Sequence, residues 1–107
     1  MIALITGDGG FIGTNLKALL RREGVEVRGF SRKNGMDVLN AEQVESAIAG
    51  ADIVFHVAAD ARPAESVLSP KETIETNLRG SLNVLEACRR HYTMLIYGGI
   101  PSNARLI

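Results

Sequence analysis

The glycine-rich segment ITGDGGFIGTNL, residues 5–16, constrains the fold more than any other part of this 107-residue chain. Its three evenly spaced glycines, Gly7, Gly10 and Gly13, lie between the apolar run IALIT and a stretch with leucines at helical spacing. A tight turn needs the φ freedom of the first glycine, the second lets the backbone approach a ligand, and the third allows close packing of strand and helix. The segment therefore predicts a strand, a turn and a helix in direct succession.

Apolar runs alternate with segments of helical periodicity along the rest of the chain. Further strands are predicted at residues 25–30, 51–59 and 93–99, and Asp37 and Val38 are predicted to end a short additional strand. The alternation predicts one α/β domain over residues 1–107, a Rossmann-like, doubly wound parallel sheet between two helical layers. Five strands in the order 3-2-1-4-5 are expected from right-handed crossovers.

Three helices are predicted between these strands, over residues 14–23, 40–50 and 69–90. Asn40 and Gln43 resemble a capping box at the start of the second helix. The third helix opens with Ser69, Pro70 and Glu72, which supply a cap, a proline at the first position and an early acid. Five apolar residues are predicted to turn toward the sheet: Ile74, Leu78, Leu82, Leu85 and Cys88.

Composition excludes several classes of protein. Twelve basic and twelve acidic residues balance, and 46% of the residues are apolar, so neither a disordered chain nor a general nucleic-acid surface is indicated. Cys88 is the only cysteine, which excludes an intrachain disulfide and a cysteine metal cage. No apolar run is long enough to span a membrane. We expect a cytoplasmic protein that binds no metal, nucleic acid or membrane.

The glycine turn has the properties of an anion-binding site. N–H groups at the start of a helix, together with the helix dipole, favour a phosphate there. Within a βαβ unit this arrangement predicts a bound dinucleotide, and the alternative is a strand-to-helix turn without a ligand. The residues predicted to contact the cofactor here are Gly7, Asp8, Gly9, Gly10, Phe11, Ile12 and Gly13.

The end of the second predicted strand indicates which dinucleotide is bound. An acid about 20 residues beyond the glycines would bind the ribose hydroxyls of NAD. Ser31, Arg32 and Lys33 occupy that position instead. A guanidinium and an ammonium group suit a 2′-phosphate, which predicts NADP, with NAD as the less favoured cofactor. The alternative interpretation is a solvated basic loop.

Three motifs together resemble the extended short-chain dehydrogenase/reductase family of NAD(P)-dependent sugar-nucleotide epimerases, dehydratases and reductases. TGDGGFIG is similar to its glycine motif, GADIVFHVAA to its fourth strand, and ETNLRGSLNVLEACRR to the following helix. The resemblance spans almost the whole chain, points to NADP, and implies a cofactor lying over these loops.

The resemblance also assigns roles to residues outside the glycine motif. It places Asp37 and Val38 beside the adenine, and a surface turn is the alternative. It implies that Asn77 lies near the nicotinamide, and a polar position on a helix surface is the alternative. His56 is expected to be structural. The strand that contains it is expected to line the cofactor through Val57, Ala58 and Ala59.

The catalytic pair that the resemblance implies is missing from the sequence. Relatives use a Tyr-x-x-x-Lys pair for proton transfer, but Ile96 follows Tyr92 and Pro101 follows Tyr97 at that spacing. We expect a family fold shortened after the fifth strand, without a substrate domain, that binds NADP(H) without turnover. Its uncovered sheet is expected to favour self-association. Two other functions stay open: an NADPH-sensing or protein-interaction module, and a site for ADP or a nucleotide sugar.

Overall fold

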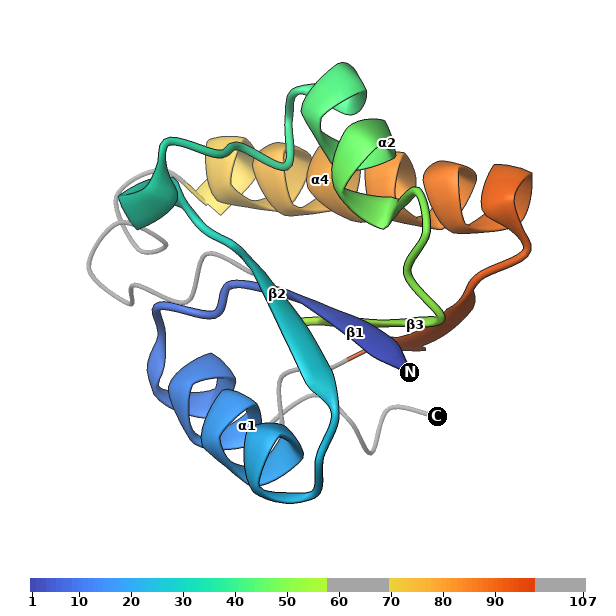
Figure 1. Cartoon of the computed structure of the whole chain (residues 1–107). Helices are drawn as coiled ribbons and strands as arrows, with labels where there is room; N and C mark the ends of the chain where they lie inside the picture. Colours follow the sequence, from blue (N-terminus) through green and yellow to red (C-terminus); the bar gives the residue numbers. More distant parts are fainter. Residues whose placement is uncertain (58–69, 98–107) are drawn as a thin grey trace, which may run out of the picture.

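The computed structural model describes residues 1–57 and 70–97. In this part, four strands form one parallel sheet in the order β2-β1-β3-β4. The strands are β1 (Ile2–Thr6), β2 (Glu26–Phe30), β3 (Ile53–His56) and β4 (Met94–Tyr97). Helix α1 lies on one face of the sheet, and α2 and α4 lie side by side on the other face (Figure 1). The helices are α1 (Phe11–Arg22), α2 (Ala41–Ile48) and α4 (Pro70–His91).

The parallel Rossmann-like architecture is confirmed, but the prediction of a strand ending at Asp37 and Val38 is wrong. The carboxylate of Asp37 accepts a hydrogen bond from the Leu39 N–H at 2.9 Å. The backbone N–H of Asp37 donates to Gln43 Oε1 at 2.9 Å. These local bonds hold the segment as a turn and remove its groups from any strand ladder. The four observed strands keep the relative order predicted for them.

The start of α2 differs in one detail from a capping box. Asn40 Oδ1 accepts a hydrogen bond from the Gln43 N–H at 3.1 Å, as predicted for the cap. The Gln43 side chain bonds to Asp37 and does not reach back to Asn40. The helix therefore has only the Asn40 half of a capping box, and the Gln43 side chain joins it to the preceding turn.

The main core lies between the sheet and the layer formed by α2 and α4. Its buried members are Leu4, Phe30, Val44, Ile48, Ala51, Val54, Val84, Ala87 and Cys88. The predicted orientation of α4 is correct for Cys88 but wrong for Ile74, Leu78, Leu82 and Leu85, which are more than half exposed. Small residues face inward because a Cβ on Gly80 would lie only 2.6 Å from Val38 Cγ2. The face of α4 that carries Gly80 is therefore buried because it allows Val38 to pack close to the helix backbone.

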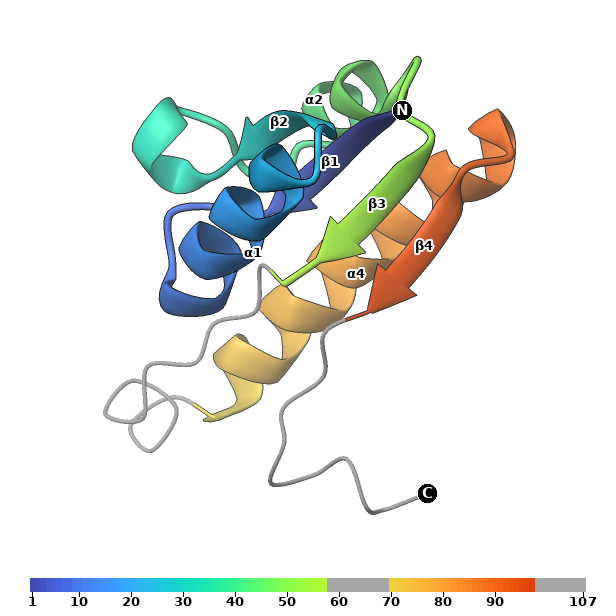
Figure 2. The ribbon, with the colours of Figure 1, turned by 60° about the horizontal axis from the view of Figure 1, so that its bottom comes forward.

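The opposite face of the sheet is only partly covered. Ala3 and Ile5 are fully buried there, on the strand next to α1. Beyond α1, no described helix covers β3 and β4 on this side (Figure 2), and Met94 and Ile96 are 64% and 44% exposed. The prediction of an uncovered apolar sheet surface is therefore confirmed for the described residues. Within the same residues, no helix is long and apolar enough to cross a membrane.

Candidate nucleotide-binding site

The glycine loop joins the end of β1 to α1 and is held against β2. Gly7 has a φ of 77°, which is the left-handed conformation that glycine adopts without steric cost. Its N–H donates to the Phe30 carbonyl at 2.7 Å, and the Gly10 N–H donates to the Gly7 carbonyl at 3.1 Å. The loop is thus a tight turn fixed to the last residue of the neighbouring strand.

The helix that follows begins without a polar cap. Gly10 is the N-cap residue of α1, makes no side-chain capping bond, and is followed by no acid in the first turn. The first N–H groups of such a helix suit a ligand anion. The Phe11 and Ile12 side chains are 86% and 56% exposed, so any anion at this end would meet backbone N–H groups. Gly13 is buried, and a Cβ there would overlap the Gly7 carbonyl oxygen.

Asp8 takes a position that the sequence did not reveal. Its carboxylate is buried beneath the loop and forms an ion pair with Lys17 on α1, in which Oδ2 and Nζ are 2.8 Å apart. Gly29 makes room for this carboxylate, because a Cβ at that position would overlap Oδ2. Since the side chain of Lys17 neutralises it, Asp8 places no uncompensated charge under the loop. Nothing in the spacing of Asp8 and Lys17 signalled this pair.

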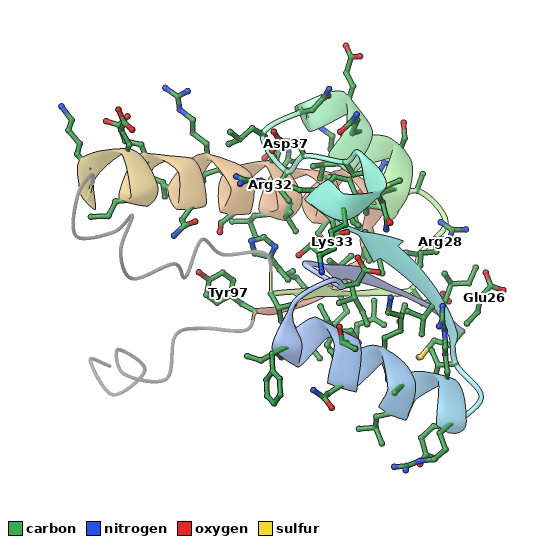
Figure 3. All side chains as sticks on the ribbon, turned by 90° about the vertical axis from the view of Figure 1, so that its left-hand side faces the viewer. Glu26, Arg28, Arg32, Lys33, Asp37 and Tyr97 are labelled. Carbon is green, nitrogen blue, oxygen red and sulfur yellow. The ribbon has the colours of Figure 1, made fainter. Side chains whose placement is uncertain are left out.

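The basic turn after β2 lies beside the glycine loop. Lys33 Nζ donates a hydrogen bond to the Gly9 carbonyl at 3.3 Å, and Ser31 is close to the same glycine. Figure 3 shows Arg32 and Lys33 leaving the same turn, with Lys33 directed toward the loop before α1. The fold therefore brings together Gly9, Ser31 and Lys33, which are up to 24 positions apart in the sequence.

Asp37 and Val38 are half-buried and lie farther along the same segment. The Asp37 carboxylate is used in its own turn, while the Val38 carbonyl accepts a 2.9 Å bond from the Asn83 side chain on α4. Val38 also fills the space above Gly80. Asp37 thus stabilises its turn, and Val38 packs against α4. The predicted contact of both residues with adenine stays a prediction.

A buried hydrogen-bond chain crosses the carboxyl ends of β1 and β3. Thr6 Oγ1 lies 2.7 Å from His56 Nδ1, and His56 Nε2 lies 3.0 Å from Ser81 Oγ on α4. Thr6 Oγ1 also accepts the Val57 N–H, and a neutral imidazole bonds to both hydroxyl groups by donating from one ring nitrogen and accepting at the other. Burial lowers the pKa of His56, which favours this neutral form. The arrangement fits the structural role expected for His56.

Asn77 lies at a groove on the α4 side of β4. The groove has a volume of about 440 Å³, and its polar lining comes from His56, Asn77, Ser81 and Tyr97. The rings of His56 and Tyr97 pack with centroids 5.6 Å apart. The predicted contact of Asn77 with a nicotinamide stays a prediction. Val57 follows β3 directly, whereas Ala58 and Ala59 lie outside the described residues.

The fold and the glycine loop define a class, a Rossmann-like domain with a glycine-rich turn between β1 and α1. The sequence profile of the NAD dependent epimerase/dehydratase family matches residues 3–99. A 2-alkyl-3-oxoalkanoate reductase from Shewanella oneidensis is 34% identical over 94% of this chain and 28% of the reductase. The chain therefore belongs to the NAD dependent epimerase/dehydratase family, and the resemblance described above is confirmed.

Solved structures agree with this assignment. A Thermus thermophilus UDP-glucose 4-epimerase in complex with NAD is 35% identical, with a TM-score of 0.78 over 94% of this chain and 40% of the epimerase. A dTDP-4-dehydrorhamnose reductase from Bacillus anthracis in complex with NADP is 26% identical, with a TM-score of 0.79 over 90% of this chain and 35% of the reductase. This chain thus spans two fifths or less of these relatives and matches their N-terminal Rossmann part. Both NAD and NADP occur among them.

Proposed function

We propose that this chain is an NADP(H)-binding domain of an epimerase, dehydratase or reductase, and that it binds the cofactor at the glycine loop. The pyrophosphate would lie at the start of α1, where Gly10 offers no side chain. The adenosine end would lie over Ser31, Arg32 and Lys33. The proposed contacts also include Asp37, Val38, Val57, Ala58, Ala59 and Asn77, as the resemblance implies.

The observation that carries the preference for NADP is the position of Lys33. Its ammonium lies at the Gly9 carbonyl, beside the loop that would hold the adenosine phosphates. The position where an acid would accept the ribose hydroxyls is occupied by Ser31. The guanidinium of Arg32 and the ammonium of Lys33 favour a 2′-phosphate over a hydroxyl.

A titration of the chain with NADPH and NADH, followed by cofactor fluorescence, tests this proposal. We expect saturable binding of NADPH, weaker binding of NADH, and loss of both in Gly10→Val, which fills the approach to the helix. Replacing Lys33 by methionine should weaken NADPH binding by about tenfold, because one charge-assisted hydrogen bond is lost. ADP and a nucleotide sugar serve as competitors. If either binds while NADPH does not, the site belongs to another nucleotide.

We further propose that the chain alone does not catalyse hydride transfer. The 107 residues contain no Tyr-x-x-x-Lys pair, so they do not supply the proton-transfer group that the resemblance implies for relatives. Binding and turnover are therefore separable in this protein. Incubation of the chain with NADP⁺ and UDP- or dTDP-glucose should give no product, whereas turnover by a purified sample would contradict this part of the proposal.

A further inference from the structure

The side chain of Lys33 lies across Gly9. A Cβ built on Gly9 would lie 3.1 Å from Lys33 Cδ, 3.6 Å from its Cε and 3.6 Å from Ser31 Oγ. A side chain in this space would displace Lys33 from its present position, in which Nζ donates to the Gly9 carbonyl. Gly9 is therefore distinct from Gly7 and Gly13, whose lack of a side chain serves the turn and the start of the helix.

We propose that Gly9 is a positioning residue that sets the cofactor preference by admitting Lys33 to the edge of the glycine loop. The inference rests on the proposed NADP(H)-binding function and adds a determinant of specificity to it. An exposed lysine has many rotamers, and contact of its methylene groups with Gly9 restricts them. The ammonium is then held beside the loop before the 2′-phosphate arrives, which lowers the entropic cost of the contact.

The bond that holds Lys33 in place is easily exchanged. At 3.3 Å from a neutral carbonyl, its ammonium makes a long hydrogen bond, and a phosphate dianion is a stronger acceptor. Asp8 does not compete for the same ammonium, because its carboxylate is paired with Lys17 beneath the loop. A 2′-phosphate would therefore gain the full attraction of Lys33, while NADH, which lacks that group, would gain nothing from it.

Gly9→Ala isolates this effect. The added methyl group would press on the flexible end of a lysine side chain, so the lysine can move aside while the backbone stays in place. Gly9 is not among the glycines with a positive φ, so alanine is tolerated by its backbone. Gly10→Ala is the matched control. Its methyl group would make an ordinary contact with the Gly7 carbonyl at 3.6 Å, and it would occupy the place where the pyrophosphate is proposed to lie.

The experiment measures the dissociation constants of NADPH and NADH for the unaltered chain, Gly9→Ala, Lys33→Met, the double variant and Gly10→Ala. We expect Gly9→Ala to weaken NADPH binding about threefold to tenfold more than NADH binding, which reduces the preference for NADPH by that factor. In the Lys33→Met background the same alanine should leave the ratio of the two dissociation constants unchanged. Gly10→Ala should weaken both cofactors equally, and thermal melting should confirm that each variant is folded.

Two results would overturn the inference while leaving the proposed function intact. The first is an unchanged preference in Gly9→Ala, including an equal weakening of both cofactors, since the glycine would then serve the pyrophosphate. The second is an equal loss of preference with and without Lys33. If the unaltered chain binds neither cofactor, the proposed function fails, and the inference fails with it.

Discussion

The ammonium of Lys17 lies 2.8 Å from Oδ2 of Asp8 and joins helix α1 to the turn that precedes it. The Asp8 side chain is only 5% exposed, and that of Lys17 is 24% exposed. The second carboxylate oxygen of Asp8 is buried, with no hydrogen-bond partner within residues 1–57 and 70–97. Lys17 is thus the main compensation for a buried charge under the proposed cofactor loop.

Lys17→Met should destabilise the chain by about 3 kcal/mol, because removal of one partner leaves a buried carboxylate without its counter-charge. Urea unfolding at neutral pH measures the change. The Asp8→Asn substitution added to this variant should recover much of the loss, since the uncompensated charge is then gone. A loss below about 1 kcal/mol in Lys17→Met would show that water, and not the lysine, solvates Asp8.

Gly13→Ala tests whether the start of α1 tolerates a side chain. In an ordinary helix interior this substitution stabilises by about 0.5–1 kcal/mol. Here the methyl group would overlap backbone atoms of Gly7 and Asp8, which cannot swing aside as a side chain can. We therefore expect a destabilisation of about 3 kcal/mol, measured by chemical unfolding. Gly10→Ala, whose methyl group meets no close contact, is the control, and a more stable Gly13→Ala protein would contradict the geometry.

The buried His56 predicts a pH dependence of stability. Burial lowers its pKa in the folded chain below the ordinary value of 6.5, so between these two values the unfolded chain binds more protons. The contribution of neutral His56 to the free energy of unfolding is therefore fully present above pH 6.5. It falls as the pH decreases toward the folded pKa, by about 1 kcal/mol for each unit between the unfolded and folded pKa.

The variant His56→Gln should flatten the unfolding free energy between pH 7 and 5, even if the variant is less stable overall. Gln also offers a side-chain donor for Ser81, the partner of His56 Nε2. His91, the other histidine, is present in both proteins, so its contribution cancels in the comparison. Parallel pH profiles of the two proteins would show that His56 does not carry the effect.

Self-association through the uncovered sheet face stays a prediction. Met94 and Ile96 of β4 are exposed, whereas Leu95 between them packs against the core. In the described sheet β4 is an edge strand, and no described helix covers it on the α1 side (Figure 2). We expect a concentration-dependent increase in mass by analytical ultracentrifugation, and a smaller increase after Ile96→Lys, because an edge charge opposes pairing. Leu19→Lys, on α1 and away from β4, is the control for added charge. A monomeric mass at high concentration would contradict the prediction.

Much of the fold was predictable because its signals are local. The run IALIT and the glycines after it predicted β1, the turn and α1, and the start of α1 differs from the prediction by three residues. The apolar pattern of α4 predicted the helix but not its buried face. Ile74, Leu78, Leu82 and Leu85 form a regular stripe, yet close packing required Gly80, Val84 and Ala87 on the inside.

The order of strands and helices, the position of the glycine turn and the basic segment after β2 could all be derived from the amino-acid sequence. They follow from hydrophobic periodicity and from backbone conformations that few residues adopt. The pairing of Asp8 with Lys17, the hydrogen-bond chain of Thr6, His56 and Ser81, and the contact of Lys33 with Gly9 depend on the folded chain. Parallel strands bring their carboxyl ends together from distant parts of the chain, and side-chain contacts across that edge leave no periodic trace in the sequence.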